Sequence, residues 1–342
     1  MRIYDLLIIG GGRVGLFLGK EFAKKGKKVL ILEKKKETEV KKKPCSSIFS
    51  KNIFLFFEKE KLKKEGIFKK EFKKIRVHVG KSFFDFEREF FLLDKEKFIE
   101  FLLKEAKKEG VEILFEKKVE EIKERKNFCE VLLDGESFLA KIVADSTGCF
   151  SFFGKKLNKN QKLLYLIGAQ FFKKKENDLL EIFFKKELPG FFLWKIPQNG
   201  LEEWGTCLLP KQKFFENFRS FLKKKFKKED FKIETAPILI SPLEKLVSKR
   251  VFLCGESSGF VKPFTGGGII YGFFCAKIAK EIIDPEKPST LKDYERKIKK
   301  TLLPKVKKGE LLRKIYFWPE FLKYYLIFLL HKIHSRFDQD LL

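Results

Sequence analysis

Apolar residues follow two different spacings along this chain, and together they predict alternating strands and helices. Residues 6–9 form a short, continuous apolar run, and residues 29–32 form a second one. Such runs are typical of parallel strands that are buried on both faces. Residues 94–110 place apolar side chains at helical spacing and end in Gly110, which predicts an amphipathic helix. The first part of the chain therefore has the pattern of an α/β protein.

The middle of the chain is richer in strands, and its end is helical. Residues 75–93 alternate between apolar and polar positions, as strands do. Asp134-Gly135 predicts the turn of a β-hairpin. Residues 160–245 contain several further strands and one lysine-rich helix, whereas residues 286–342 predict a helical tail with apolar runs. We therefore expect a mixed sheet inserted into the α/β domain, and a helical segment after it.

The composition is that of a folded and strongly basic protein. Of the 342 residues, 44% are hydrophobic and 36% are charged, which excludes a disordered chain. Lys and Arg outnumber Asp and Glu by 75 to 47, and the formal charge of +28 favours nucleic acid, anionic lipid head groups or acidic proteins as partners. The lysines are spread along the whole chain, so a compositional drift toward Lys is the alternative explanation.

Other features argue against several classes of protein and site. The six cysteines form no CxxC pair and only three histidines occur, so we expect no metal site and a reducing compartment. The apolar N-terminus runs straight into glycines, as a buried strand does and a signal peptide does not. No run of about 20 uncharged apolar residues predicts a membrane-spanning helix. His78 lies in a strand pattern, where a lone histidine is usually a satisfied side chain.

The first apolar run leads into a glycine-rich turn that predicts dinucleotide binding. Gly10, Gly12 and Gly15 have G-x-G-x-x-G spacing between a strand and a helix. The first glycine permits the tight turn, the second lets a pyrophosphate approach the backbone, and the third lets the helix pack on the strand. Glu33 closes the second strand about 20 residues later, where a carboxylate can accept from ribose hydroxyls. This spacing alone does not separate FAD from NAD.

Two later segments favour FAD. Residues 140–157 form a strand that ends in Asp145, followed by Thr147-Gly148 and Ser151. Residues 250–283 contain a strand, a Gly-Glu corner, an irregular loop and three glycines before a long apolar helix. The glycine-rich start of this helix can face an anionic or electron-rich group. One long ligand that contacts all three segments fits FAD, whereas NAD would leave the last segment without a role.

Four motifs give the chain a resemblance to a known family. They read KPCSS at 43–47, DSTGCFS at 145–151, PGFFLWKIP at 189–197 and GESSGFVKPFTGGGI at 255–269. Over roughly residues 3–285, the chain resembles the FAD-dependent geranylgeranyl reductase family, within the flavoproteins built like para-hydroxybenzoate hydroxylase. The PGFFLWKIP motif separates this family from the aromatic hydroxylases.

The resemblance implies a fold, a cofactor and a set of site residues. The implied fold is α/β, with an FAD-binding Rossmann-like domain of the glutathione-reductase type, an inserted mixed β-sheet substrate domain and a helical C-terminal tail. The implied boundaries are 1–50, 94–158 and 246–285 for the FAD domain, 51–93 and 159–245 for the substrate domain, and 286–342 for the tail. The residues expected to contact FAD are Gly10, Gly12, Val14, Gly15, Glu33, Pro44, Cys45, Ser47, Lys95, Val119, Asp145, Gly148, Gly255, Glu256, Gly267, Gly268 and Ile269.

The resemblance also implies roles around the flavin. Cys45 is expected beside the isoalloxazine ring, where it either gates access to the flavin or helps to deliver a proton to the substrate; a buried structural cysteine is the alternative. Phe192 and Trp194 are expected to contact the substrate, although Phe192 stands where the family has Tyr. Further departures are Glu256 in place of Asp, Lys95 in place of Arg, and serines at 46 and 47 in place of glycines. These departures concern the substrate more than the cofactor.

By this resemblance, the protein is expected to reduce carbon–carbon double bonds of a geranylgeranyl lipid or a prenyl quinone tail. The electron donor is expected to be a small acidic carrier such as ferredoxin, or NAD(P)H, because the chain has no second dinucleotide turn. The alternatives are a flavin monooxygenase on the same fold and a nucleic-acid or membrane-binding module that retains the flavin fold. We expect a cytoplasmic protein without a nucleic-acid partner, whose tail either contacts the inner face of a membrane or packs over the substrate domain.

Overall fold

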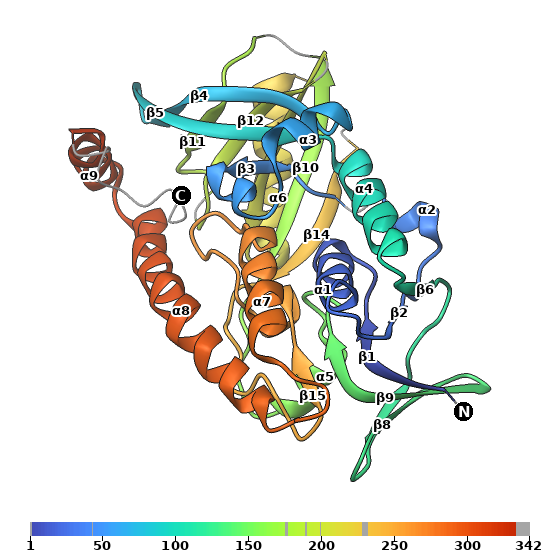
Figure 1. Ribbon diagram of the computed structural model, residues 1–342. Coiled ribbons are helices and arrows are strands. Elements are labelled where there is room, and N and C mark those ends of the chain that lie inside the picture. The colour runs from blue at the N-terminus through green and yellow to red at the C-terminus, as the bar shows by residue number, and fades with distance from the viewer. Residues whose placement is uncertain are drawn as a thin grey trace.

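The computed structural model describes residues 2–42, 44–174, 177–188, 190–198, 200–227 and 232–332. Within them, seven strands form a first sheet with the order β6-β2-β1-β9-β8-β7, and β15 also pairs with β9 (Figure 1). Its parallel part consists of β1 (Ile3–Ile9), β2 (Val29–Leu32), β6 (Glu112–Leu114), β9 (Glu136–Asp145) and β15 (Val251–Leu253). The antiparallel part consists of β7 (Glu121–Glu124) and β8 (Cys129–Leu133). The two apolar runs form β1 and β2 at the centre of this sheet.

Helices from three parts of the chain pack together beside this sheet. Helix α1 (Arg13–Ala23) contacts both α4 (Lys95–Lys108) and α7 (Ile269–Ile282). Phenylalanines fill the space between them: the ring centroids of Phe17 and Phe273 lie 4.9 Å apart, and both rings contact Phe57. The abundant Phe of this chain thus forms much of the core that holds α1, and with it the glycine turn, in place.

A second sheet, in which most neighbouring strands are antiparallel, lies above the first sheet in the view of Figure 1. Its order is β14-β10-β13-β12-β11-β4-β5-β3 among the described residues, and β11 pairs with β4 in parallel. Its strands are β3 (Ile48–Ser50), β4 (Phe68–Val79), β5 (Ser82–Leu93), β10 (Tyr165–Lys174), β11 (Glu181–Phe184), β12 (Leu193–Gln198), β13 (Leu201–Leu208) and β14 (Glu234–Leu239). Helix α6 (Gln212–Phe226) covers one face, where Phe218 and Leu222 pack with Trp204.

Short elements connect the two sheets. They are α2 (Glu37–Val40), η1 (Lys51–Leu55), α3 (Lys59–Lys64), α5 (Phe152–Leu157) and η2 (Gly255–Ser258). The C-terminal segment then follows as α8 (Thr290–Arg313), η3 (Lys314–Phe317) and α9 (Glu320–Lys332). Helix α8 packs along α7, and α9 reaches β4 and β5 (Figure 1). There the ring centroids of Tyr324 and Phe84 lie 5.4 Å apart. Helix α9 therefore brings the C-terminal segment back to the second sheet.

The predicted fold class is confirmed, with two sheets and C-terminal helices. The Asp134-Gly135 turn joins β8 to β9, and the predicted amphipathic helix is α4, whose N-terminus Asp94 caps through hydrogen bonds from the backbone N–H groups of Glu96 and Lys97. The domain boundaries stay a prediction; residues 48–50, included in the first domain, pair with β5 in the second sheet. Residues 333–342 of the expected tail lie outside the described residues. No helix of the described chain is long and apolar enough to cross a membrane.

Candidate active site

A cavity of about 920 Å³ lies between the carboxyl ends of the parallel strands and the inner face of the second sheet. Ligand pockets usually measure about 300–1,000 Å³, so this cavity accommodates a long ligand or two smaller ones. Ligands of open α/β sheets bind outside the carboxyl ends of the strands. The position of the cavity therefore matches the position that the glycine motifs predict.

The glycine turn forms one wall of the cavity. Gly10 adopts a left-handed backbone conformation, with φ of +106°, directly after β1. A Cβ on Gly15 would collide with the carbonyl oxygen of Gly10, whereas a Cβ on Gly12 would meet open space. Helix α1 starts at Arg13, and Gly12 carries no side chain to cap it. The turn thus keeps both room and backbone N–H groups for an anionic ligand at the positive end of a helix dipole.

Glu33 lies at the end of β2 and contributes to the same wall. Its Oε2 accepts a hydrogen bond from the backbone N–H of Gly11 at 2.8 Å, and its Oε1 accepts from that of Lys35 at 2.9 Å. These bonds fix the carboxylate beside the glycine turn. Because an ionised carboxylate has about four acceptor positions, Glu33 can still accept from ribose hydroxyls.

Asp145 organises the second predicted segment from beneath the cavity wall. The side chain is fully buried at the end of β9. Its carboxylate accepts hydrogen bonds from the backbone N–H and hydroxyl of Thr147, from the hydroxyl of Ser151 and from the N–H of Phe153. This network shapes the turn that presents Ser146, Thr147 and Gly148 to the cavity.

The third segment packs directly against the glycine turn. Gly255 has φ of +85°, and a Cβ there would press on Val14. A Cβ on Gly272 in α7 would collide with the same valine. The loop after η2 then brings Gly267, Gly268 and Ile269 to the cavity, just before or at the start of α7. The three segments far apart in sequence therefore form one continuous wall.

The loop before β3 lies at the junction of the two sheets. Pro44, Cys45 and Ser46 line the cavity, and Cys45 is half-buried. The backbone N–H of Ser47 donates to the Cys45 Sγ at 3.4 Å. Ser47 is buried with φ of +54°, which is uncommon for a residue with a side chain and favours glycine. The backbone thus has a left-handed conformation at a position where the family that this chain resembles has glycine.

The inner face of the second sheet forms an apolar wall that includes Trp194. The indole Nε1 of Trp194 donates to Oε1 of Glu203 at 2.9 Å, and Gln198 Nε2 donates to Oε2 at 2.9 Å. Glu203 is fully buried, and burial raises its pKa from 4.5 to about 7. A Cβ on Gly205 would collide with the indole ring. A buried carboxyl group and a glycine together fix the orientation of this cavity-lining tryptophan.

The C-terminal segment also contributes to the cavity. Five apolar side chains from α8, η3 and α9 line it, namely Leu312, Ile315, Leu326, Ile327 and Leu330. The ring of Tyr316 stacks on Phe264 with centroids 5.0 Å apart, and its hydroxyl donates to the Phe264 carbonyl oxygen. The opposite side of the same segment is exposed and apolar, with Leu311, Phe317, Trp318, Phe321, Leu322, Tyr325 and Leu329.

Most residues predicted from the sequence line this cavity. They are Gly10, Gly12, Val14, Glu33, Pro44, Cys45, Val119, Gly148, Glu256, Gly267, Gly268, Ile269, Phe192 and Trp194. The remaining five, Gly15, Ser47, Lys95, Asp145 and Gly255, lie behind or beside the lining residues. The ammonium group of Lys95 lies 5.7 Å from the centre of the Phe172 ring. Lys43 and Pro189 of the predicted motifs lie outside the described residues. The individual roles in binding and catalysis stay predictions.

The sequence interpretation did not identify Arg88, Glu203 or the cavity face of α9. Arg88 lines the cavity between Phe86 and Phe90. A signal for it exists in the stretch FDFEREF, because a cation occupies a position that strand alternation assigns to the apolar face. Glu203 and α9 carry no comparable signal, since their positions depend on pairing with distant strands.

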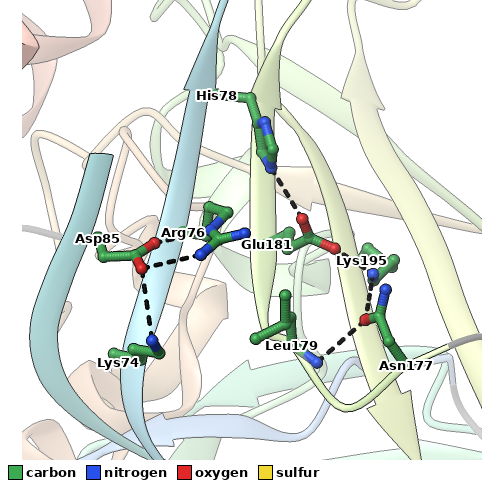
Figure 2. Close-up of polar contacts among 8 residues, drawn as sticks. All are labelled: Lys74, Arg76, His78, Asp85, Asn177, Leu179, Glu181 and Lys195. Atoms are coloured by element: carbon green, nitrogen blue, oxygen red, sulfur yellow. Dashed lines mark hydrogen bonds and ion pairs between the residues drawn. The ribbon is translucent and has the colours of Figure 1, made fainter. Parts of the chain in front are cut away.

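The outer face of the second sheet carries a separate group of charged side chains (Figure 2). Arg76 forms two hydrogen bonds to Asp85, at 2.8 and 2.9 Å, and His78 Nε2 lies 2.8 Å from Glu181 Oε1. Although burial alone raises the pKa of Glu181, hydrogen bonds from His78 and Lys195 bring it below its usual value. His78 is therefore a paired side chain on the opposite face from the cavity, and it does not contribute to this site.

The residues present fit FAD. The glycine turn leaves open space at Gly12, the Glu33 carboxylate is fixed beside it, and the wall continues without interruption to the glycine-rich loop before α7. The apolar wall of the second sheet faces this same space, so a second, apolar ligand fits beside a dinucleotide. The arrangement is suited to a reaction between a bound cofactor and a hydrophobic substrate.

Comparisons with known proteins agree with this arrangement. Residues 5–172 match the family model described as lycopene cyclase protein. An uncharacterised protein of Methanocaldococcus jannaschii is 29% identical over 92% of this chain and 84% of its own. A digeranylgeranylglycerophospholipid reductase of the same organism is 24% identical over 87% of this chain and 82% of its own. A geranylgeranyl bacteriochlorophyll reductase-like structure from Thermoplasma acidophilum has a TM-score of 0.78 and 20% identity, and covers 92% of this chain and 88% of its own.

Proposed function

We infer that this chain, which belongs to the FAD-dependent geranylgeranyl reductase family, reduces carbon–carbon double bonds of an isoprenoid lipid. The observation that carries the proposal is the single cavity in which three dinucleotide-type segments face an apolar wall. A dinucleotide site alone would fit many oxidoreductases. An apolar wall of this extent, which continues onto the C-terminal helices, favours a long hydrophobic substrate.

The residues that hold FAD in this proposal come from all three segments. The glycine turn and α1 receive the pyrophosphate, Glu33 accepts from the ribose, and the loop before α7 with Glu256 contacts the remainder of the cofactor. When bound and reduced, FAD supplies a hydride to one carbon of the double bond. The protein supplies binding, orientation and exclusion of water around that double bond.

The second sheet orients the substrate. Phe192 and Trp194 lie on the cavity wall, and the Glu203 hydrogen bond holds the indole in place. Apolar side chains of β4 and β11, such as Val77 and Ile182, extend the same wall. Burial of a polyisoprenoid chain there removes its apolar surface from water, at about 25 cal/mol per Å². The site thus binds the substrate through its chain and positions one double bond.

Cys45 is the proposed source of the proton for the second alkene carbon, either directly or through an ordered water. It lines the cavity at the junction of both walls and is half-buried, whereas Cys129, Cys254 and Cys275 are fully buried. A Cys45→Ala variant should retain FAD and lose most turnover, with Cys129→Ala as the control. Unchanged turnover and flavin reduction in Cys45→Ala would leave the cysteine with a structural role only.

The electron donor in this proposal is a small acidic carrier such as ferredoxin, or NAD(P)H. The formal charge of +28 accelerates encounters with an acidic protein.

The proposal also includes contact between the C-terminal segment and a membrane. The exposed side of η3 and α9 is apolar, while the other side of the same segment lines the cavity. An apolar surface of this kind, flanked by basic residues, suits insertion at the level of lipid head groups.

An anaerobic reoxidation experiment tests the proposed reaction. The holoprotein is reduced chemically, a geranylgeranyl lipid is added, and the return of oxidised flavin absorbance is followed, with the fully saturated lipid as the control. Reoxidation by the unsaturated lipid alone supports the proposal, and one double bond of the lipid should be reduced for each flavin that is reoxidised. Reoxidation only after air is admitted would contradict it and indicate oxygen chemistry on the same fold.

A further inference from the structure

Lys262 is a buried lysine in the wall of the cavity. It lies in the loop between η2 and α7, lines the cavity, and is only 7% exposed. An ammonium group is strongly hydrated, so its burial costs free energy unless negative charge compensates for the lost water. A buried cation in the wall of a ligand cavity therefore suits a ligand that acquires negative charge.

The loop fixes this lysine at the start of α7. The backbone N–H of Lys262 donates to the carbonyl oxygen of Gly267 at 3.1 Å, and that of Gly266 donates to the carbonyl oxygen of Lys262 at 2.8 Å. A Cβ on Gly267 would lie 3.7 Å from Cδ of Lys262, so the lysine side chain runs past the residues that precede the helix. Helix α7 begins at Ile269, and Gly268 offers no side chain to cap it. The lysine and the positive end of a helix dipole thus lie at the same part of the cavity.

This part of the cavity is where its two walls meet. Val261 and Phe264, on either side of Lys262, belong to the apolar cluster that packs against the second sheet. A Cβ on Gly266 would lie 3.5 Å from Sγ of Cys207, a residue of β13 that also lines the cavity. Hydride transfer requires the flavin ring to lie beside the substrate. In the proposed binding mode, the ring end of FAD therefore belongs at this junction, and the adenosine end belongs at the glycine turn.

We propose that Lys262 stabilises the reduced, anionic form of the flavin ring and thereby raises the reduction potential of bound FAD. This inference rests on the proposed function for the position of the ring, and it adds a residue that sets the electron affinity of the ring. Uptake of two electrons from the external donor and one proton leaves the ring with one negative charge, which a nearby ammonium group stabilises. Transfer of the hydride to the alkene removes both electrons and that proton, and the ring becomes neutral again.

Glu256 gives the expected effect a definite sign. Glu256 and Lys262 are the two charged residues between positions 255 and 269, and both line the cavity. A neutral side chain at position 262 leaves this segment with a net negative charge, which disfavours a negative charge on the ring. Loss of the lysine charge should therefore lower the reduction potential.

The test measures the reduction potential of the bound FAD, so it does not depend on turnover. Each holoprotein is reduced slowly under anaerobic conditions together with a reference dye of known potential, and the absorbance of both is followed. Lys262→Met should lower the equilibrium constant for two-electron reduction by about tenfold, which corresponds to a fall of about 30 mV. Lys262→Arg should stay close to wild type, because it keeps the charge.

Lys34→Met is the matched control, because Lys34 lines the cavity next to Glu33, at the adenosine end of the proposed cofactor site. It removes the same charge and should leave the potential close to that of wild type. An unchanged potential in Lys262→Met, or an equal fall in Lys34→Met, would overturn the proposal. Lys262→Gln is measured in parallel, and loss of FAD from both neutral variants would assign Lys262 to retention of the cofactor and overturn the proposal as well.

The outcomes separate this proposal from the proposed function. If the potential falls in Lys262→Met but a geranylgeranyl lipid does not reoxidise the reduced wild-type protein, the role of Lys262 stands and the reductase reaction fails. If the lipid reoxidises the wild-type protein but Lys262→Met keeps the wild-type potential, the reaction stands and the role of Lys262 fails.

Discussion

Replacement of Glu203 by Gln should change the pH dependence of stability in a defined direction. Glu203 is fully buried on β13, where it accepts from the neutral donors of Trp194 and Gln198. Burial raises its pKa to about 7, and the hydrogen bond from Trp194 and the charge of Lys95 oppose this increase only in part. Glutamine has nearly the same shape, keeps an acceptor for Trp194, and cannot ionise. The variant therefore isolates the energetic effect of the buried charge.

The magnitude follows from the difference between the folded and unfolded pKa values. In the unfolded chain, Glu203 loses its proton near pH 4.5, whereas in the folded protein it keeps the proton until about pH 7. The unfolded state therefore binds fewer protons in this interval, so the free energy of unfolding falls as pH rises. The difference between a pKa of 4.5 and one of about 7 corresponds to about 3 kcal/mol. This stability is fully present below pH 4.5 and is lost by the time the pH exceeds about 7.

The assay is denaturant unfolding of wild type and Glu203→Gln at pH 4.5 and pH 8, with FAD at saturation. The variant should be close to wild type at pH 4.5 and about 3 kcal/mol more stable at pH 8. Glu202→Gln is the contrasting control, because Glu202 lies 3.2 Å from the ammonium group of Lys173 and its neutral replacement should lower stability at pH 8. If the difference between Glu203→Gln and wild type is the same at both pH values, the buried-acid explanation is wrong.

Three further substitutions test other parts of the structure. Gly15→Ala forces a Cβ against the Gly10 carbonyl oxygen, and such overpacking costs about 1–3 kcal/mol. The purified variant should therefore carry little flavin absorbance. Full flavin content would contradict the packing argument. Ser47→Gly relieves a left-handed backbone conformation, which costs a residue with a side chain about 1–2 kcal/mol. The greater flexibility of glycine in the unfolded chain offsets part of this gain. The denaturation midpoint of the variant should therefore rise, and a fall would refute this. Phe321→Glu places a charge on the exposed side of α9, so cosedimentation with anionic vesicles should decrease while the melting temperature stays constant; unchanged cosedimentation would count against the membrane contact.

The parts of the site that the sequence predicted are those whose chemistry is local. The glycine turn depends on three residues within six positions, between an apolar run and a helix, and the structure places Gly10 and Gly12 at the cavity with the expected backbone. The Asp134-Gly135 turn is likewise fixed by two adjacent residues. Such signals require no knowledge of distant contacts, because the backbone conformation they need is available to few residue types.

The remainder depends on which strands become neighbours. Strand β11 pairs in parallel with β4, about 100 residues earlier in the chain, and this pairing brings Ile182 beside Val77 on the cavity wall. Helix α9 reaches β5 from the far end of the chain through the contact of Tyr324 with Phe84. Neither pairing leaves a periodic signal in the residues involved. The roles assigned to Lys95 and Asp145 show the same limit, since neither residue is among those that line the cavity.

Charged side chains have different surroundings on the two faces of the second sheet, and this difference affects which ligands the inner face can bind. On the outer face, Arg76 and Lys195 are paired with carboxylates (Figure 2). On the inner face, burial raises the pKa of the Glu203 carboxyl group to about 7, while Arg88 has two unpaired donors. The inner wall therefore carries a positive charge that no described side chain hydrogen-bonds at Nε and Nη2. A ligand without hydrogen-bond acceptors would leave these two donors unpaired, at a cost in free energy.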